Sequence, residues 1–178
     1  MDIRNTDPAD GQTLRSDKED SSEPGFDSQL LDLVPFEVGE RIFAVFADQV
    51  AGRAEGKVPA PLPRAPVGVL GVVCVRGRML TVLDPVGVLT GEALTWPDRL
   101  PSVIALRGDE QMALAAHRCR DTITTADADI QRSEDPDGES VDPVLGLVRH
   151  GGEESTVLNI ERLFGAAMRR RERRRRRF

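Results

Sequence analysis

Short runs of apolar residues alternate with polar positions and turns along the middle of the chain. Residues 34–38 alternate, Gly39-Glu40 forms a turn, and residues 41–46 are apolar on both faces. This pattern predicts a β-hairpin whose return strand is buried. Three further pairs follow: 69–75 with 79–83, 103–106 with 112–116, and 144–148 with 156–158. Four hairpins with little helix predict an all-β domain that closes into barrels, and no repeat unit of fixed length is apparent.

Two short helices are predicted at the ends of hairpins. Asp84 precedes Pro85, the order typical of an N-cap followed by a first-turn proline, and opens a helix to Leu89. Asn159 can cap a closing helix over residues 160–168, because its apolar residues recur at helical spacing.

Two segments lack such patterns. The stretch 59–66 holds four prolines, which leaves too few amide donors for a helix or a central strand. Residues 127–141 are acidic and contain Gly and Pro, so we expect a long exposed loop there.

Charge divides the 178-residue chain into three parts. The whole chain carries 24 Lys and Arg against 30 Asp and Glu, a net charge of −6. Residues 1–32 have a net charge of −6 and few apolar residues, so they are expected to be disordered. Residues 33–168 form the predicted domain. Residues 169–178 form an arginine-rich tail of net charge +7, also expected to be disordered; its arginines are Arg169, Arg170, Arg171, Arg173, Arg174, Arg175, Arg176 and Arg177.

The arginine-rich tail has three interpretations. It can be a solvated terminus that the chain's own acidic head neutralises. It can act as an electrostatic tether to an anionic membrane surface, where each arginine contributes about 1 kcal/mol. It can also bind nucleic acid without sequence preference. The acidic body and the small number of aromatics (six Phe, one Trp, no Tyr) disfavour nucleic acid, so a membrane or an acidic partner ranks first.

Composition also excludes several classes of protein. Two cysteines 45 residues apart make no disulfide framework. The N-terminus is acidic where a signal peptide needs a basic start, and the longest apolar run, residues 67–75, is far shorter than a membrane helix of roughly 20 residues. We therefore expect a soluble, cytoplasmic protein.

No cluster of residues argues for catalysis, a metal or a cofactor. His117 and Cys119 share one face of a strand, but a metal site needs three or four ligands, and Cys74 is expected to be a small buried hydrophobe. Residues 52–58 depart from the phosphate-loop pattern in both spacing and the final hydroxyl. The sequence has no G-x-S-x-G elbow. It therefore predicts no enzyme, no metal and no cofactor.

The second hairpin carries a recognisable pattern. Residues 71–84 read GVVCVRGRMLTVLD, which resembles the segment G-V-I-N-L-R-G-x-I-x-P-V-I-D-L of CheW-like domains in bacterial chemotaxis. The order of hairpin, prolines, Arg-Gly turn, second hairpin and closing helix extends the resemblance from about Leu33 to Phe164.

The resemblance implies a fold and a function. The fold would be two intertwined five-stranded SH3-like barrels with a few short helices. The function would be that of a non-catalytic adaptor, which couples methyl-accepting chemotaxis receptors to a CheA-type histidine kinase at the inner membrane face. The alternative is a diverged β-barrel module whose arginine-rich tail binds nucleic acid or an anionic membrane.

The resemblance also implies a receptor-binding groove. Val50, Gly71 and Arg76 occupy positions that resemble receptor-groove residues of the family. An exposed arginine on a rigid turn can donate to helix-end carbonyls or to a receptor carboxylate, and Gly71 would permit close backbone approach. The chain departs from the family where Glu-Ile is replaced by Ala51-Gly52 and where an Asp is replaced by His117.

Overall fold

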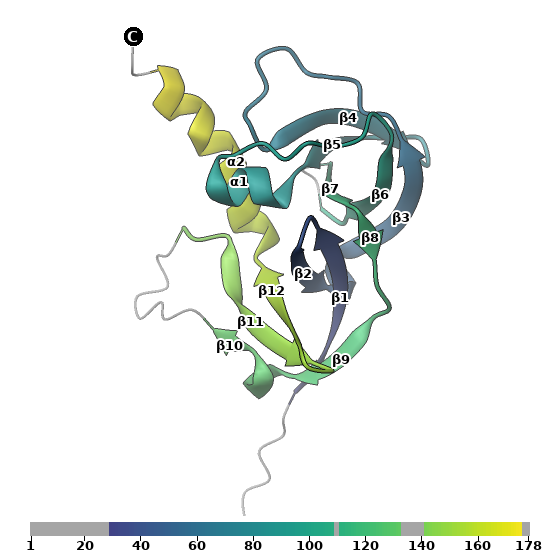
Figure 1. The fold of residues 1–178 in the computed structure, drawn as a ribbon, viewed down its shortest axis with the longest axis vertical. Helices are drawn as coiled ribbons and strands as arrows, with labels where there is room; N and C mark the ends of the chain where they lie inside the picture. Colours follow the sequence, from purple (N-terminus) through teal and green to yellow (C-terminus); the bar gives the residue numbers. More distant parts are fainter. Residues whose placement is uncertain (1–28, 109–110, 133–140, 176–178) are drawn as a thin grey trace, which may run out of the picture.

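The computed structural model describes residues 29–108, 111–132 and 141–175, with side chains as far as Met168. These residues form two curled sheets and two α-helices, α1 (Pro85–Thr90) and α2 (Ile160–Arg175) (Figure 1). The strands are β1 (Leu30–Val38), β2 (Arg41–Phe46), β3 (Val50–Lys57), β4 (Val69–Val75), β5 (Arg78–Leu83), β6 (Leu100–Leu106), β7 (Met112–Ala116), β8 (Arg118–Cys119), β9 (Ile123–Ala126), β10 (Gln131–Arg132), β11 (Val144–His150) and β12 (Glu153–Leu158). Single 3-10 turns, η1 (Ala47–Gln49) and η2 (Asp127–Asp129), precede β3 and β10.

The two sheets confirm the predicted all-β fold with two barrel-like units. One sheet has five strands in the order β3-β6-β7-β5-β4. The other has seven, in the order β10-β11-β12-β2-β1-β8, with β9 also pairing with β1. Short strands β8 and β9 pair in succession with the same strand, β8 at Phe36 and Glu37 and β9 at residues 30–33. They therefore act together as one interrupted strand.

Each sheet combines hairpins from both halves of the chain. In the seven-stranded sheet, β2 pairs in parallel with β12, with Phe43 opposite Thr156. In the five-stranded sheet, β5 pairs in parallel with β7, with Val82 opposite Ala113. The five-stranded sheet comes from one contiguous segment, β3 to β7, whereas the seven-stranded sheet takes β1 and β2 from before that segment and β8 to β12 from after it, which explains the intertwined fold.

Apolar side chains form three cores. The largest, which we call the central core, lies between the sheets and beneath both helices, and its large side chains include Phe36, Phe43, Leu114, Leu158 and Leu163. The five-stranded sheet encloses a second core around residues such as Val73, Leu80 and Val103. The seven-stranded sheet encloses a third, around residues such as Leu33 and Val157. Alternate residues of one strand therefore enter different cores, as the two-residue period of a strand requires.

The structure corrects the expectation that no repeat exists. Residues 69–83 and 144–158 share Val-Leu-Gly at the start and Thr-Val-Leu at the end, 75 residues apart. Both copies form a hairpin with a bulge just before the glycine, and both lead into a helix. The repeat is hard to see in the sequence because solvent-facing and turn residues differ between the copies.

Several local predictions were wrong at their boundaries. Strand β1 begins at Leu30, inside the segment expected to be disordered, whereas residues 1–28 lie outside the described part of the chain. Strands β3, β8 and β9 were not predicted, because their sequences have little apolar alternation and take their hydrogen bonds from neighbours. The expected exposed loop 127–141 contains η2, β10 and Ile130, which is buried in the third core.

The closing helix is longer than predicted. Asn159 caps it as expected, since its Oδ1 accepts a hydrogen bond from the Arg162 amide at 3.0 Å. The helix continues past Met168 to Arg175, into the tail that was expected to be disordered. Arginine has a high helix propensity, and cations near a helix C-terminus interact favourably with the helix dipole. No described helix has both the length and the apolar character needed to cross a membrane.

Candidate functional site

Val50 begins β3 directly after η1 and is half-buried against the central core. Its carbonyl oxygen accepts a hydrogen bond from Nε of Arg107 at 3.1 Å, and the neighbouring Gln49 carbonyl accepts one from the Arg107 amide at 2.7 Å. The backbone at the start of β3 is thereby fixed to the end of β6. Sequence analysis missed Arg107, because nothing in a turn sequence indicates a contact 57 residues away.

Arg76 occupies the two-residue turn between β4 and β5. Val75 pairs with Arg78, and the turn residues Arg76 and Gly77 have φ values of +49° and +79°. Positive φ at both central residues is typical of a type I′ turn, whose twist matches that of the two strands. The glycine of this turn was predicted from the sequence. Arginine in the left-handed region is uncommon, and such strain is often found at functional sites.

The Arg76 side chain lies against β3. A Cβ atom built at Gly52 would be 3.3 Å from Nη1 of Arg76, so the guanidinium lies over a residue that has no side chain. Gly52 is two residues beyond Val50. The structure therefore brings two of the three predicted receptor-binding residues, Val50 and Arg76, to one place on the surface.

Gly71 lies apart from that place, at the other end of β4. It is buried, has a φ of +142°, and follows a bulge in the pairing with β5. A Cβ atom there would be 2.4 Å from the Ala60 carbonyl oxygen. Ala60 exchanges two backbone hydrogen bonds with Val72, at 2.8 and 2.9 Å. The backbone that approaches Gly71 closely is therefore that of Ala60 in the same protein. This contact joins the segment after β3 to strand β4.

Arginines on the two sheets differ in their partners. On the seven-stranded sheet and the turns beside it, ion pairs with acidic residues are formed by Arg120 (twice), Arg132 and Arg149. On the five-stranded sheet, Arg76 makes no ion pair or hydrogen bond with any described residue, and Arg78 reaches only the Gly108 carbonyl at 3.4 Å. The guanidinium of Arg76, close to Val50, is therefore not paired with any described carboxylate.

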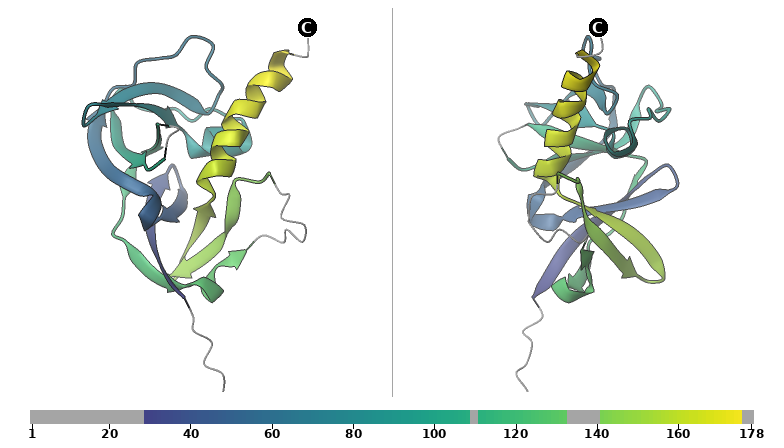
Figure 2. Two further views of the ribbon diagram at one scale, coloured as in Figure 1. Left: turned by 180° about the vertical axis from the view of Figure 1, so that it is seen from behind. Right: turned by 90° about the vertical axis from the view of Figure 1, so that its left-hand side faces the viewer.

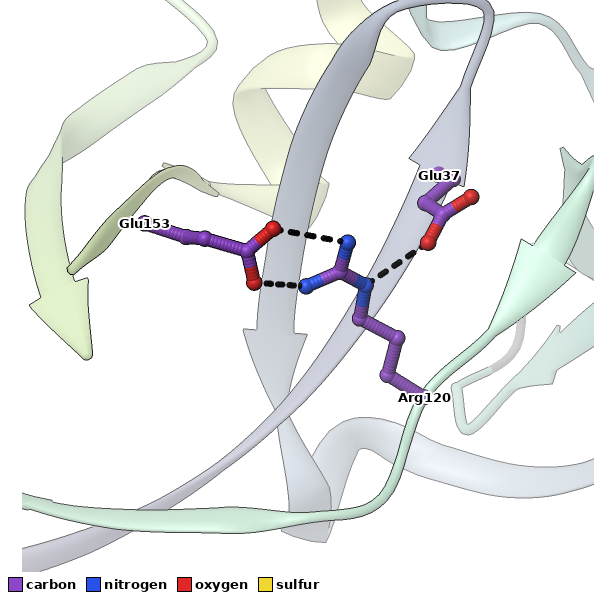
Figure 3. A network of polar contacts seen from close by, with 3 residues as sticks. All are labelled: Glu37, Arg120 and Glu153. Atoms are coloured by element: carbon purple, nitrogen blue, oxygen red, sulfur yellow. Dashed lines mark hydrogen bonds and ion pairs between the residues drawn. The ribbon is translucent and has the colours of Figure 1, made fainter. Parts of the chain in front are cut away.

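The seven-stranded sheet shows how a paired arginine behaves in this fold. Nε of Arg120 donates to Glu37 at 2.8 Å, and its two terminal nitrogens bind both carboxylate oxygens of Glu153 (Figure 3). These hydrogen bonds lower the pKa of Glu153 and raise the pKa of Arg120. The network links β1, β12 and the segment after β8, so it stabilises the sheet and uses three of the five N–H donors of Arg120 within the fold.

His117 and Cys119 have structural surroundings. The His117 ring stacks on Trp96 with ring centroids 4.3 Å apart, and its Nδ1 accepts a hydrogen bond from the Gly39 amide at 3.1 Å. Burial raises the pKa of the Cys119 thiol. Among the described residues, no three His, Cys, Asp or Glu side chains gather as metal ligands would.

Cys74 corrects an expectation. It was predicted to be buried, but it is exposed, because the inward positions of β4 are 71, 73 and 75. It pairs directly with Met79, whose side chain is 55% exposed. This pair forms an apolar spot on the hairpin whose turn carries Arg76, and apolar surface beside free cationic groups is typical of protein-binding sites.

Comparison with known proteins identifies the family. The family profile described as "CheW-like domain" matches residues 32–168, well over half of the chain. The chain belongs to the CheW-like domain family. A "Chemotaxis protein CheW" from Rhizobium meliloti (strain 1021) is 32% identical over 105 residues, which are 58% of this chain and 67% of that protein.

A solved structure supports the same fold. The scaffolding protein TtCheW from Thermoanaerobacter tengcongensis superposes with a TM-score of 0.63 at 16% sequence identity. The match covers 76% of this chain and 93% of that one. The two-sheet architecture is therefore that of a CheW-like domain, which confirms the resemblance seen in residues 71–84.

The departures from the CheW-like pattern now have structural consequences. Where family members usually have Ile, Gly52 makes room for the Arg76 guanidinium. Where they usually have Asp, His117 accepts a hydrogen bond from the β1–β2 turn, as a carboxylate could. The first change alters the surface near Val50, whereas the second preserves a contact inside the fold.

Proposed function

We propose that this protein is a non-catalytic scaffold of a bacterial chemotaxis signalling complex, which couples chemoreceptors to a CheA-type histidine kinase. Membership of the CheW-like family over residues 32–168 supports the scaffold role. The curated relative and the solved structure, named as a chemotaxis protein and a scaffolding protein, support the same role. In this role the protein would act with the receptors at the inner face of the membrane.

The receptor surface that we propose centres on Arg76 and Val50. The observation that carries it is the position of the Arg76 guanidinium, exposed, unpaired among described residues and lying across β3 two residues from Val50. A helical receptor tip offers carbonyls at its ends and carboxylates along its sides, and the planar guanidinium can bind either. Gly71 serves this surface indirectly, because it allows β4, which leads into the Arg76 turn, to pair with Ala60.

A second surface, for the kinase, is the exposed pair Cys74 and Met79. These side chains lie on the outer face of the β4–β5 hairpin, opposite the buried pair Val73 and Leu80. An exposed methionine adapts its shape to a partner and buries apolar area on binding. The receptor would thus contact the turn of the β4–β5 hairpin, and the kinase would contact its strands. With both partners on one hairpin, binding of one can shift the populations of the conformations of the other.

Co-sedimentation tests the receptor surface. Receptor signalling tips incorporated into vesicles of zwitterionic lipid should sediment the wild-type protein, and Arg76→Glu should abolish this while the protein stays folded. Arg64→Glu is the matched control, since Arg64 is also exposed and also has a positive φ, of 59°. If Arg76→Glu bound as well as the wild type, Arg76 would not be part of the receptor site. If Arg64→Glu lost as much binding as Arg76→Glu, the change in net charge alone would explain the loss.

A pull-down with the kinase tests the second surface. Met79→Lys should weaken kinase capture at least about tenfold, because it places a charge in an apolar contact. The same variant should keep its receptor binding. Loss of both activities, or of neither, would contradict separate surfaces on the hairpin.

A further inference from the structure

Helix α2 continues past the last of its side chains that is buried in the core. Its first two turns are held by Ile160, Leu163 and Ala167, which are buried in the central core, and α2 also packs on α1. Met168 is already 46% exposed. The helix then continues to Arg175, eight residues past Ala167, which is about 12 Å at 1.5 Å per residue. Its end lies at the opposite end of the long axis from the start of β1 (Figures 1 and 2).

The extension is almost purely cationic. Residues 169–175, which we call the arginine arm, hold six arginines and Glu172, a net charge of +5 in two helical turns. Arginines recur at i and i+4 three times, from Arg169 with Arg173 onward, and such like-charge pairs destabilise an isolated helix. An anionic partner would reduce this repulsion, so binding such a partner should stabilise the helical conformation of the arm.

The remainder of the domain has the opposite charge. Residues 29–168 contain thirteen Lys and Arg against twenty-one Asp and Glu, a net charge of −8. An anionic partner that ran along the body would be repelled. A flat anionic surface can instead meet the end of the arm, and body charges farther from that surface than about 8 Å, the Debye length at physiological salt, are largely screened.

We propose that the arginine arm of α2 binds the anionic headgroups of a lipid membrane. The chain has few aromatics to stack on nucleic-acid bases. A basic segment alone gives weak, reversible attachment, so the arm acts as the second signal beside any protein partner.

Vesicle sedimentation without receptor or kinase tests this proposal separately from the coupling role. The full chain is mixed with vesicles of phosphatidylcholine alone, or of phosphatidylcholine with about a third phosphatidylserine. We expect binding only to the anionic vesicles. The triple variant Arg169→Gln, Arg170→Gln, Arg171→Gln should lower the partition coefficient about a hundredfold, since each arginine contributes about fivefold. Replacing the same three residues by Lys is the matched control and should keep the binding.

Several results would overturn the proposal. The first is equal binding by the Gln and Lys variants, and the second is binding to uncharged vesicles. The third is tighter binding to a 20-base-pair DNA duplex than to anionic vesicles at the same salt concentration. A variant without residues 1–28 should bind the anionic vesicles at least as well as the full chain; weaker binding would also contradict a lipid contact made by the arm. Circular dichroism should show helix content rising with anionic vesicles, and unchanged helix content would contradict the stabilisation argued above.

Discussion

The carbonyl oxygen of Ala60 occupies the space that a side chain at Gly71 would need, 2.4 Å from the position of its Cβ. This contact joins the segment after β3 to β4, which are the two outer parts of the five-stranded sheet. The second half of the chain repeats it, because a Cβ at Gly146 would lie 2.4 Å from the Gln131 carbonyl oxygen. Each unit therefore closes where a glycine lets a second backbone approach.

Gly71→Ala should destabilise the fold by at least about 2 kcal/mol, since it combines a disfavoured φ with a backbone clash. Gly39→Ala is the matched control: its φ is +61°, but nothing lies within 4 Å of the added carbon, so about 1 kcal/mol is expected. Urea unfolding measures both free energies. Equal losses in the two variants would mean that the contact with Ala60 contributes nothing beyond the backbone angle.

Arg76→Gly should separate stability from binding. Glycine adopts the positive φ of residue 76 without steric cost, so we expect the free energy of unfolding to rise by up to about 1 kcal/mol. Receptor binding should be lost, because the guanidinium is removed. Arg64→Gly removes the same charge and relieves a similar φ, of 59°, so it should gain similar stability and keep receptor binding. Thermal unfolding and receptor co-sedimentation measure the two effects. A loss of stability in Arg76→Gly would show that the guanidinium packed over Gly52 outweighs the backbone strain.

Asp84 tests the repeated helix cap. Its buried side chain accepts hydrogen bonds from the amides of Val86, at 3.0 Å, and Leu94, at 3.4 Å. Asp84→Ala should cost about 2 kcal/mol, because both amides lose a buried acceptor. Asp84→Asn should cost less, since an Asn side chain can also accept from a first-turn amide, as Asn159 does from the amide of Arg162 at the start of α2. Denaturant unfolding measures both free energies of unfolding. Equal losses in Asp84→Ala and Asp84→Asn would contradict a capping role for the side-chain oxygen.

Glu153 makes the stability of the fold depend on pH. Its pKa is lowered by the hydrogen bonds from Arg120, so its contribution is fully present above the unfolded pKa and is lost as pH falls through the folded pKa. Glu153→Gln should therefore melt below wild type at pH 7, and the gap should narrow as pH falls below about 4.5. Glu154→Gln, which leaves Arg120 untouched, is the control. A gap that stays constant down to pH 3 would contradict a role for the Glu153 carboxylate.

Sequence patterns correctly predicted the elements that local chemistry determines. Four hairpins, the Asp84 and Asn159 caps and the turn at Gly77 follow from alternation, capping and the cost of positive φ, all of which act over a few residues. The segment 71–84 was also sufficient to identify the family. The functional suggestion for Arg76 came from that resemblance, since an arginine in a turn is not distinctive by itself.

Tertiary structure decided the rest, because the remaining contacts join residues that are far apart in sequence. Strands β8, β9 and β10 exist because neighbouring strands supply their hydrogen bonds. Gly71 allows the Ala60 backbone to pair with β4 and so closes the five-stranded sheet, whereas the Arg76 side chain lies over β3 close to Val50. The spacing of these residues in the sequence does not show which of them has a structural role and which lies on the surface. The arginine run reads as a solvated tail when taken alone. It becomes an arm on a folded body because α2, packed in the central core through Ala167, continues as one helix to Arg175.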